Sequence, residues 1–332
     1  MKRRTFIFCL AGTAAAGLTG LRLAGSGTPS RMVKVTRRGF ALGTQVSLTV
    51  FHPNEKEAHN ALDAAFAELD KVEDIMSLYR PGSQISQLNN SGKLVDPHPY
   101  LVEVLEESQA LSRATNGAFD ITIQPLWKLH FEHSRKGTKA SSKEIGEALA
   151  LVDYRRLKVS QESIELGSRG QEVSLNGIAQ GYAADRVAAV LEAHGVESAL
   201  IDTGEFGAIG AHAEKDSWSV GIKHPRQQDA LMGVAPLKGK CLATSGDYET
   251  RFSEDYRHHH LLDPQTGYSP EELSSVSVIA DSAMQADALS TAVFLLGLEN
   301  GRVMIEERPG VEAVFVTKDG REIRTDGFPS IS

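Results

Sequence analysis

Near the C-terminus, the apolar segment 283–297 carries the polar side chains Asp287, Ser290 and Thr291 close together. In a helix, residues four apart share a face, so Asp287 and Thr291 should project together with Ser290 beside them. A helix that is otherwise apolar all round is expected to be buried, and a buried carboxylate needs a partner. No Lys or Arg occurs within this segment. The sequence therefore predicts either a cation from another segment or a metal ion.

A second candidate is the segment 174–182, Ser-Leu-Asn-Gly-Ile-Ala-Gln-Gly-Tyr, which is typical of a strand, a tight turn at Gly177 and a helix start. Backbone N–H groups at a helix N-terminus can bind phosphate. Gly177 could equally be there for turn geometry alone. The segment has neither the GxGxxG nor the GK[ST] pattern, so it fits neither the dinucleotide-binding fingerprint nor a P-loop.

The third candidate joins segment 243–249 to segment 257–267, which contains His258, His259 and His260. In an extended chain neighbouring side chains point to opposite faces, so at most His258 and His260 could share a metal. No HExxH spacing supports zinc, and a strand before the Asp263-Pro264 turn explains the run as well. One imidazole here could still accept a proton near neutral pH.

Two further loops carry aromatic residues, in segments 76–89 and 117–126. In the first, Tyr79 stands beside the Pro81-Gly82 turn. An exposed Tyr can stack on a flat ligand ring, although many exposed tyrosines are ordinary surface residues. Taken singly, neither loop identifies a function.

The elements that must position these residues are mixed in type. Apolar residues spaced three or four apart predict a long amphipathic helix over 55–76, and other helices are expected over 101–115, 142–151 and 177–194. Strands are expected over 43–51, 157–166, 171–175, 198–202, 217–223, 233–237, 240–244, 274–280 and 311–316, with loops over 79–90 and 134–142. Helices and strands do not alternate strictly. This favours an α+β fold of mixed, largely antiparallel sheets with packed helices over a doubly wound parallel sheet.

Residues 1–30 resemble a twin-arginine export signal. Arg3-Arg4-Thr5-Phe6 precedes a short apolar run and then small residues. A membrane anchor is the alternative, but the run is short and rich in Gly and Thr. We therefore expect a signal peptide over 1–30, one domain over 31–332 and a periplasmic location. The net charge of −8 argues against nucleic acid as the main partner.

Together, the five segments, which follow one another along the chain as 76–89, 117–126, 174–182, 243–267 and 283–297, resemble the ApbE family of FAD:protein FMN transferases. The resemblance implies an ApbE-like fold and a reaction in which FAD is split at its pyrophosphate. FMN would be joined to a Thr or Ser hydroxyl of a target protein, and AMP would be released. It also implies Mg²⁺, with Asp287, Thr291 and the backbone of Gly177 as ligands, and hard oxygen ligands of this kind suit Mg²⁺.

The resemblance implies roles for other residues as well. Tyr79 would lie on the flavin ring, and the backbone near Leu261 and Leu262 would contact the flavin. Ala118, Phe119 and Asp120 would surround the nucleotide. His260 would take the proton of the target hydroxyl, with Asp247 as the alternative.

The chain departs from the family pattern at three places. Ser174 stands where an acidic residue is expected to hold part of FAD, and Gln180 replaces a lysine near phosphate. Gly204-Glu205-Phe206 replaces a Gly-Gly-Asp segment. The departures suit exported NosX-type members, which flavinylate a membrane-bound electron-transfer partner. They also leave two alternatives open, a non-catalytic periplasmic FAD carrier and an FAD pyrophosphatase, because all three proteins need the same pocket.

Overall fold

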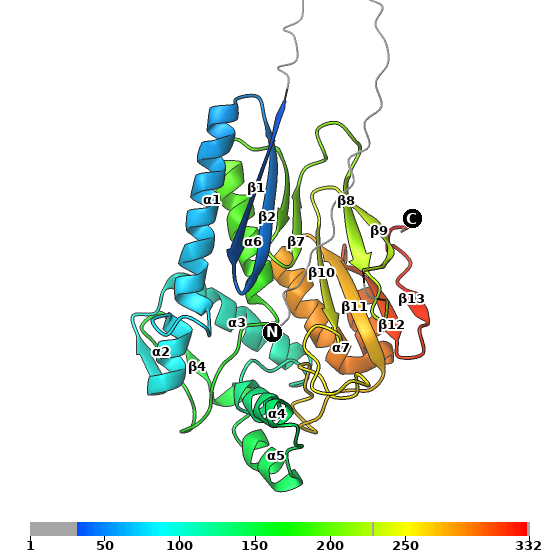
Figure 1. Cartoon of the computed structure of the whole chain (residues 1–332). Helices are drawn as coiled ribbons and strands as arrows, with labels where there is room; N and C mark the ends of the chain where they lie inside the picture. The colour runs from blue at the N-terminus through cyan, green and yellow to red at the C-terminus, as the bar shows by residue number, and fades with distance from the viewer. Residues whose placement is uncertain (1–31, 228, 331–332) are drawn as a thin grey trace, which may run out of the picture.

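The computed structural model describes residues 32–227 and 229–330. The predicted signal peptide therefore lies outside the described residues. Most of the remaining chain is built around one large sheet, with helices on one face and a hairpin on the other (Figure 1).

The main sheet has eight strands, and every neighbouring pair in it is antiparallel. In spatial order the strands are β1 (Val33–Ala41), β2 (Thr44–His52), β6 (Ser198–Asp202), β7 (Phe206–Ile209), β10 (Cys241–Gly246), β11 (Leu273–Ala280), β12 (Glu312–Thr317) and β13 (Glu322–Arg324). The predicted α+β class with largely antiparallel sheets is confirmed.

Smaller strands and the helices complete the fold. The minor sheets are β3 (Lys93–Val95) with β5 (Ser163–Glu165) and β4 (Lys158–Val159), and the hairpin β8 (Trp218–Lys223) with β9 (Leu231–Leu237). The helices are α1 (Glu55–Met76), α2 (Gln84–Ser91), α3 (Pro99–Ala114), α4 (Gln124–Lys136), α5 (Ser142–Leu149), the short 3₁₀ turn η1 (Tyr154–Arg156), α6 (Ala179–Ala193) and α7 (Ala283–Glu306).

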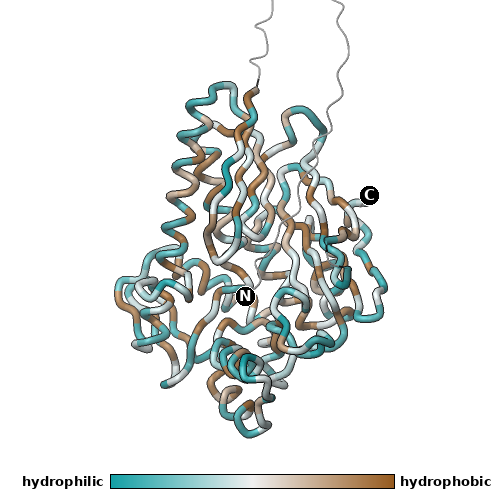
Figure 2. The backbone as a smooth tube through the Cα atoms, viewed as in Figure 1, coloured by the Kyte–Doolittle hydropathy of each residue, from teal (hydrophilic) through white to brown (hydrophobic). Residues whose placement is uncertain are grey.

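Alternating side chains give the main sheet two buried faces. On β2, Leu48 and Val50 belong to the core shared with α1 and α6, whereas Phe51 points to the opposite face and packs with Trp218 of β8. Figure 2 shows the apolar residues gathered along the strands and the inner sides of these helices. The sheet is therefore the middle of three layers, and α6 and α7 lie side by side on one face of it.

The loop predicted over 79–90 is partly wrong, because α2 occupies its second half. Ser83 caps this helix by accepting from the backbone N–H of Ser86 at 3.2 Å, and Gly92 ends it in a left-handed conformation with φ of 77°. Ile85 and Leu88, three residues apart, bury its inner side. The polar composition hides the helix, but the cap and these two residues are enough to form it.

The two central helices are joined at the start of α7. The Asp185 carboxylate of α6 accepts hydrogen bonds from the backbone N–H groups of Ala283 and Met284, at 2.7 and 2.9 Å. Carboxylates stabilise a helix N-terminus by satisfying these N–H groups. The register of α6 against α7 is therefore fixed at this end.

Helix α7 is long and apolar enough to cross a membrane by length and composition alone. It breaks at Gly297, which has φ of 78° and ψ of 179°. Most of its apolar residues are buried against β10, β11 and α6, as in the core helix of a globular domain, whereas Val303 near its end is exposed. The predicted burial of this helix is confirmed.

Candidate functional site

Asp287 lies in the interior of the protein, on the face of α7 that meets α6. Its side chain is 4% exposed. Among the described residues, the carboxylate receives one hydrogen bond, from the backbone N–H of Gly181 at 3.0 Å. The pKa of Asp287 is raised to about 7, mainly by burial; the Gly181 N–H opposes the shift, and the Asp185 charge contributes to it. The sequence predicted that Asp287 has no salt-bridge partner on its own helix. In the described part of the chain, the Asp287 carboxylate forms no ion pair with any Lys or Arg.

Hydroxyl groups continue the polar face of α7 toward β10. The Oγ atom of Ser245 in β10 lies 2.8 Å from the Oγ atom of Ser290 and 3.0 Å from the Oγ1 atom of Thr291. Ser290 also donates to the backbone carbonyl of Asp287 at 2.9 Å. Sequence reasoning did not select Ser245, although it lies in the segment 243–249 singled out there. It fixes the orientation of Thr291.

The turn at Gly177 packs directly on Thr291. A Cβ atom at residue 177 would lie 2.9 Å from the Thr291 Oγ1, so only a glycine lets the backbone approach this closely. The structure therefore brings Gly177, Asp287 and Thr291 together from two segments more than 100 residues apart.

These three residues fit a divalent cation. Asp287 presents a carboxylate, Thr291 a hydroxyl and Gly177 its backbone carbonyl. Oxygen atoms of these kinds are the hard donors that Mg²⁺ prefers. Within the described residues no group of three or more His, Cys, Asp or Glu side chains is arranged to hold a metal. A cation here would therefore depend on hydroxyl and carbonyl oxygens in addition to carboxylate.

Gly181 sets the distance between α6 and α7. A Cβ at this position would lie 2.2 Å from the Ala283 carbonyl oxygen and 2.7 Å from the Cβ of Asp287. We expect Gly181→Ala to lower the free energy of unfolding by about 1–3 kcal/mol, because backbone atoms must move. Urea denaturation, monitored by circular dichroism, measures the free energy of unfolding.

The matched control is Gly146→Ala in α5, where a Cβ meets no atom within 4 Å. It should stabilise the protein by about 0.4–1 kcal/mol, because alanine reduces the freedom of the unfolded chain. Equal stability of the two variants would contradict the close approach of α6 and α7.

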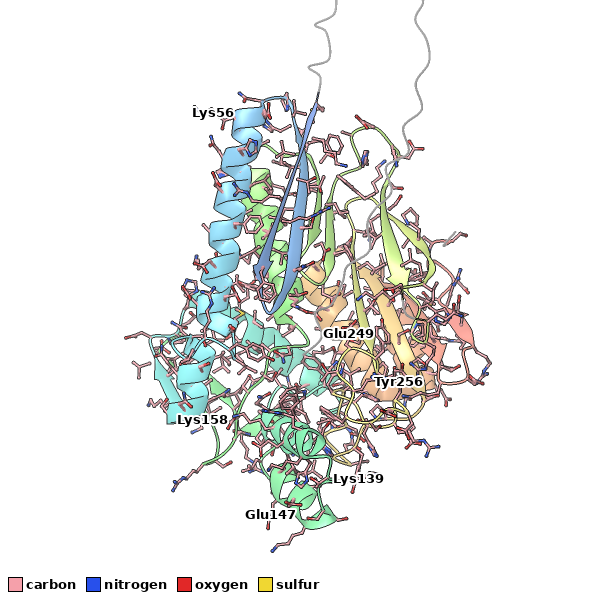
Figure 3. All side chains as sticks on the ribbon, viewed as in Figure 1. Lys56, Lys139, Glu147, Lys158, Glu249 and Tyr256 are labelled. Atoms are coloured by element: carbon pink, nitrogen blue, oxygen red, sulfur yellow. The ribbon has the colours of Figure 1, made fainter. Side chains whose placement is uncertain are left out.

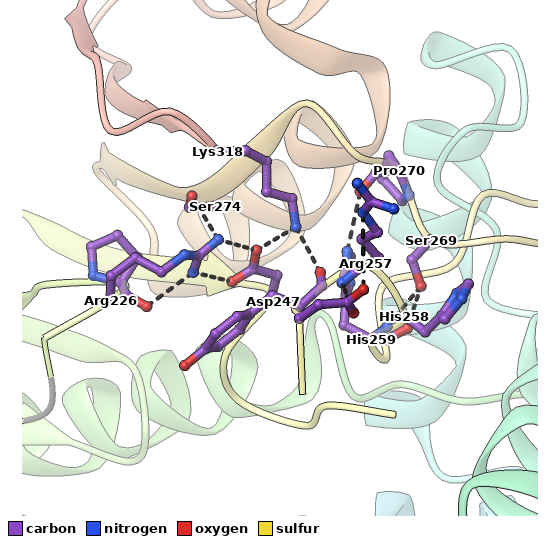
Figure 4. A network of polar contacts seen from close by, with 12 residues as sticks. Arg226, Asp247, Arg257, His258, His259, Ser269, Pro270, Ser274 and Lys318 are labelled. Carbon is purple, nitrogen blue, oxygen red and sulfur yellow. Dashed lines mark hydrogen bonds and ion pairs between the residues drawn. The ribbon is translucent and has the colours of Figure 1, made fainter. Parts of the chain in front are cut away.

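Asp247 is held in an ion-pair network at the end of β10 (Figure 4). The carboxylate is fully buried and accepts from both terminal nitrogens of Arg226 at 2.7 Å each, and from the Lys318 ammonium at 2.5 Å. Lys318 also donates to the Tyr256 carbonyl at 2.8 Å, and the Arg226 guanidinium lies 4.2 Å from the centre of the Tyr256 ring. Asp247 therefore anchors the loop that leads to His260.

Breaking this network should destabilise the loop. Asp247→Asn leaves Arg226 and Lys318 without a counter-charge, and we expect a loss of about 2 kcal/mol, below the range for fully buried pairs because both cations are partly exposed. Asp255→Asn, an exposed change in the same loop, should leave the unfolding midpoint nearly unchanged. Thermal unfolding of the two variants decides this; an unchanged midpoint for Asp247→Asn would mean that the network does not hold the loop.

His260 follows this anchored loop. Its backbone N–H donates to the Thr250 carbonyl at 3.0 Å, and its Nδ1 lies 3.3 Å from the same oxygen. The next residues, Leu261 and Leu262, are 7% and 3% exposed. His259 is fully buried among Ser269, Pro270 and Phe294, so of these two histidines His260 is the more accessible. Asp247 is fully buried and engaged by Arg226 and Lys318, so its carboxylate is not presented to a ligand.

Tyr79 is exposed on a loop whose backbone is fixed by its neighbour. Its side chain is 74% exposed. Arg80 makes ion pairs with Asp70, Glu73 and Asp74 on α1, at 2.6, 2.7 and 2.5 Å. An aromatic ring presented by a fixed loop is available for stacking.

The segment 118–120 is buried in a different way. Ala118 and Phe119 are 7% and 4% exposed. Asp120 accepts hydrogen bonds from the Thr122 N–H and hydroxyl and from the Tyr154 N–H, at 2.8, 2.6 and 2.9 Å. Burial raises its pKa and these bonds oppose that shift. The Asp120 side chain therefore fixes the local backbone.

Hydrogen bonds connect the five segments into one region. Asn89 of α2 exchanges two hydrogen bonds with the backbone of Val173, at 2.7 and 2.8 Å, and the Ser174 N–H donates to the Ile121 carbonyl at 2.8 Å. The segment that contains Ser174 then leads to Gly177, which packs on Thr291. Arg226 and Lys318 were missed by sequence reasoning, since nothing in their local sequence indicates that they meet Asp247.

Gln180 and the turn after β6 also meet at this region. The Gln180 side chain packs on Gly204, where a Cβ would lie 2.7 Å from its Nε2. The Thr203 hydroxyl donates to the Gln180 carbonyl at 3.0 Å. Two of the three positions that depart from the family pattern are therefore in contact.

Known proteins resemble this chain over most of its length. The sequence model of the ApbE family matches residues 42–315. The FAD:protein FMN transferase of Treponema pallidum (strain Nichols) is 31% identical over 324 aligned residues, covering 89% of this chain and 88% of that protein. The FAD:protein FMN transferase of Klebsiella pneumoniae (strain 342) is 32% identical over 291 residues, covering 84% and 87%.

Solved structures agree with these sequence matches. The crystal structure of the ApbE protein from Thermotoga maritima superposes with a TM-score of 0.78 at 29% identity, covering 89% of this chain and 97% of that one. The segments that meet at Asp287, Thr291 and Gly177 all lie within the matched range.

Proposed function

The chain belongs to the ApbE family, and from this premise we propose that it is an FAD:protein FMN transferase that joins FMN to a Thr or Ser hydroxyl of a target protein. Its relatives in Treponema pallidum and Klebsiella pneumoniae carry that enzyme name. The single observation that carries the proposal is the buried Asp287 carboxylate beside Thr291, against the Gly177 turn.

The reaction balances as a phosphoryl transfer. The hydroxyl oxygen of the target attacks the phosphorus of the FMN half of FAD, and a new P–O bond forms. The P–O bond to the AMP half breaks, and AMP leaves with the bridging oxygen. The proton of the target hydroxyl passes to a base. Catalysis of such transfers depends mainly on positioning and on charge stabilisation.

We assign the cation to Mg²⁺ and its ligands to Asp287, Thr291 and the backbone carbonyl of Gly177. When bound, Mg²⁺ would neutralise charge on the pyrophosphate oxygens. Asp287 is suited to this role because burial leaves it with one backbone donor, and Ser245 holds the Thr291 hydroxyl in place. Tyr79 would stack on the flavin ring.

We assign the base to His260. The network of Asp247 with Arg226 and Lys318 fixes the loop that precedes His260. Asp247 would therefore position His260, and His260 would receive the proton of the target hydroxyl. A histidine can accept a proton near neutral pH and pass it to solvent.

The twin arginines Arg3 and Arg4 support export to the periplasm. The target would then be an exported protein or the exported part of a membrane-bound electron-transfer subunit. Fractionation of cells expressing the full chain tests this location. Export should fail when both arginines are replaced by lysine, and unchanged periplasmic recovery would contradict the twin-arginine route.

The activity is tested by incubating the purified protein with FAD, Mg²⁺ and a candidate target domain. The expected result is flavin fluorescence on the target in a denaturing gel, with AMP released in equal amount. Free FMN and AMP with no labelled target would indicate an FAD pyrophosphatase. Bound but uncleaved FAD, across candidate targets, would indicate an FAD carrier.

A further inference from the structure

Glu205 lies in the tight turn between β6 and β7, close to the polar face of α7. The turn is closed by the Asp202–Phe206 pair and by Gly204, which has φ of 103°. Strand β7 pairs with β10 only at Cys241 and Leu242. Beyond that point the Glu205 Oε2 accepts from the backbone N–H of Thr244 at 3.1 Å. The Glu205 carboxylate therefore accepts a backbone hydrogen bond of β10 at a position where a neighbouring strand would otherwise accept it.

Two contacts locate Glu205 relative to the proposed cation ligands. Thr244 directly precedes Ser245, whose hydroxyl lies 3.0 Å from that of Thr291. On the other side, Gly204 packs on Gln180, which directly precedes the residue that donates to Asp287. Glu205 is therefore held between the chain positions that contact Thr291 and Asp287.

The charges around Glu205 are acidic. Burial and then the Asp287 charge raise the pKa of Glu205 well above its usual range, and Glu249 and Asp202 add to this. Glu249 follows the end of β10 at Gly246 and is labelled in Figure 3. Within the described residues, neither Glu205 nor Asp287 forms an ion pair with Lys or Arg. Two carboxylates whose charges interact in this way repel each other unless a proton or a cation lies between them.

We propose that Glu205 is a second carboxylate of the divalent-cation site, facing the cation of Asp287 and Thr291 with the oxygen that Thr244 does not engage. The inference rests on the proposed function, because it concerns the same cation. It also accounts for Gln180: a lysine there would reach the same turn and compete with the cation for Glu205. The ligand class is a hard divalent ion such as Mg²⁺ or Mn²⁺.

The competing role for Glu205 is purely structural, as an acceptor for the Thr244 N–H. Glu205→Gln separates the two roles, because the amide oxygen can keep that hydrogen bond while the charge is lost. Asp202→Asn is the matched control, since it removes one negative charge from the same turn. Among the described residues, Asp202 accepts a hydrogen bond from the local Gly204 N–H, at 3.1 Å.

The test is Mn²⁺ binding to the purified protein at pH 8 without FAD, measured from the electron paramagnetic resonance signal of free Mn²⁺. Glu205→Gln should weaken Mn²⁺ affinity about 10–100-fold, the range for groups that support a metal site. Asp202→Asn should change it less than about threefold, as expected for a more distant charge. Thermal unfolding without Mn²⁺ should show Glu205→Gln at least as stable as the original chain, and the stabilisation by added Mn²⁺ should be reduced.

Each failure has a distinct meaning. Unchanged Mn²⁺ affinity in Glu205→Gln, with binding lost in Asp287→Asn, overturns the role of Glu205 and leaves the proposed function intact. Equal Mn²⁺ affinity in Asp287→Asn and the original chain overturns the cation site itself. An equal loss of Mn²⁺ affinity in Glu205→Gln and Asp202→Asn also overturns the proposal. The loss would then come from removing a negative charge from the turn and not from contact between Glu205 and the cation.

Discussion

Asp287→Asn is expected to lower the rate of FMN transfer about 1000-fold at saturating FAD. A metal ion contributes several kcal/mol of charge stabilisation to a transfer of this kind, and each 1.4 kcal/mol is about a factor of ten. The asparagine keeps the size of the side chain and can still accept from the Gly181 N–H, so the loss comes from the charge. Initial rates of AMP release, measured across Mg²⁺ concentrations, give the effect.

The control for Asp287→Asn is Asp281→Asn. Asp281 is exposed just before α7 and pairs with Lys240 at 2.5 Å. Its replacement removes the same charge near the same helix and should leave the rate within about twofold, since exposed pairs contribute little. If Asp287→Asn kept more than a tenth of the original rate, the metal assignment would be wrong.

The Asn variant should fold. In the cation-free protein the pKa of Asp287 is raised from 3.8 to about 7, so its ionisation costs stability as the pH rises through that interval. Asn lacks this cost and should be at least as stable at pH 8. Thermal unfolding at pH 8 without Mg²⁺ checks that the lost rate is not lost folding.

The same raised pKa predicts how Mg²⁺ binding depends on pH. Below about 7 the Asp287 carboxyl is protonated in the cation-free protein and cannot ligate a metal, so binding should weaken as the pH falls from 8 to 6. Calorimetric titrations with Mg²⁺ at several pH values measure this. Affinity that stays constant over this interval would contradict Asp287 as a ligand.

His260→Asn should lower the transfer rate about 100–10,000-fold while leaving FAD binding unchanged, because a general base acts in the transition state. His258→Asn is the matched control, since it removes a partly exposed imidazole two residues away. The acidic limb of the rate–pH profile should disappear in His260→Asn and persist in the control. A normal rate in His260→Asn, or a variant that loses only FAD affinity, would remove His260 from the role of base.

The sequence predicted the elements with strong periodic patterns. Helix α1 begins at Glu55 and ends at Met76 as expected, because its apolar residues recur at helical spacing and Asn54 caps it by accepting from the Lys56 N–H at 3.0 Å. Strand β6 also matches its predicted bounds.

Elements with weak local patterns were predicted less well. Helix α4 runs to Lys136, although residues 134–142 were expected to form a loop, because their polarity resembles a loop while Gly137 supplies the actual stop. Residues 157–166, expected as one strand, form the two short strands β4 and β5. The strand expected over 171–175 is reduced to an isolated bridge between Glu172 and Ile123.

Sequence reasoning identified the polar face of α7 but not the tertiary contacts that support it. The i and i+4 spacing of Asp287 and Thr291 identified the polar face of α7 correctly, since helix periodicity fixes it. The pairing of Asp247 with Arg226 and Lys318, and of Glu205 with the backbone of Thr244, depends on tertiary contacts between distant segments. No local pattern encodes those contacts.

The central claim is that Asp287 and Thr291 close a cation site against Gly177, on the pyrophosphate of FAD. An anomalous difference map from crystals of the protein grown with FAD and Mn²⁺ tests it most directly. We predict one strong Mn²⁺ peak in contact with the Asp287 carboxylate, the Thr291 hydroxyl and the Gly177 carbonyl, bridging to phosphate oxygens of FAD. FAD bound with its pyrophosphate away from Asp287, or Mn²⁺ bound elsewhere, would contradict the claim.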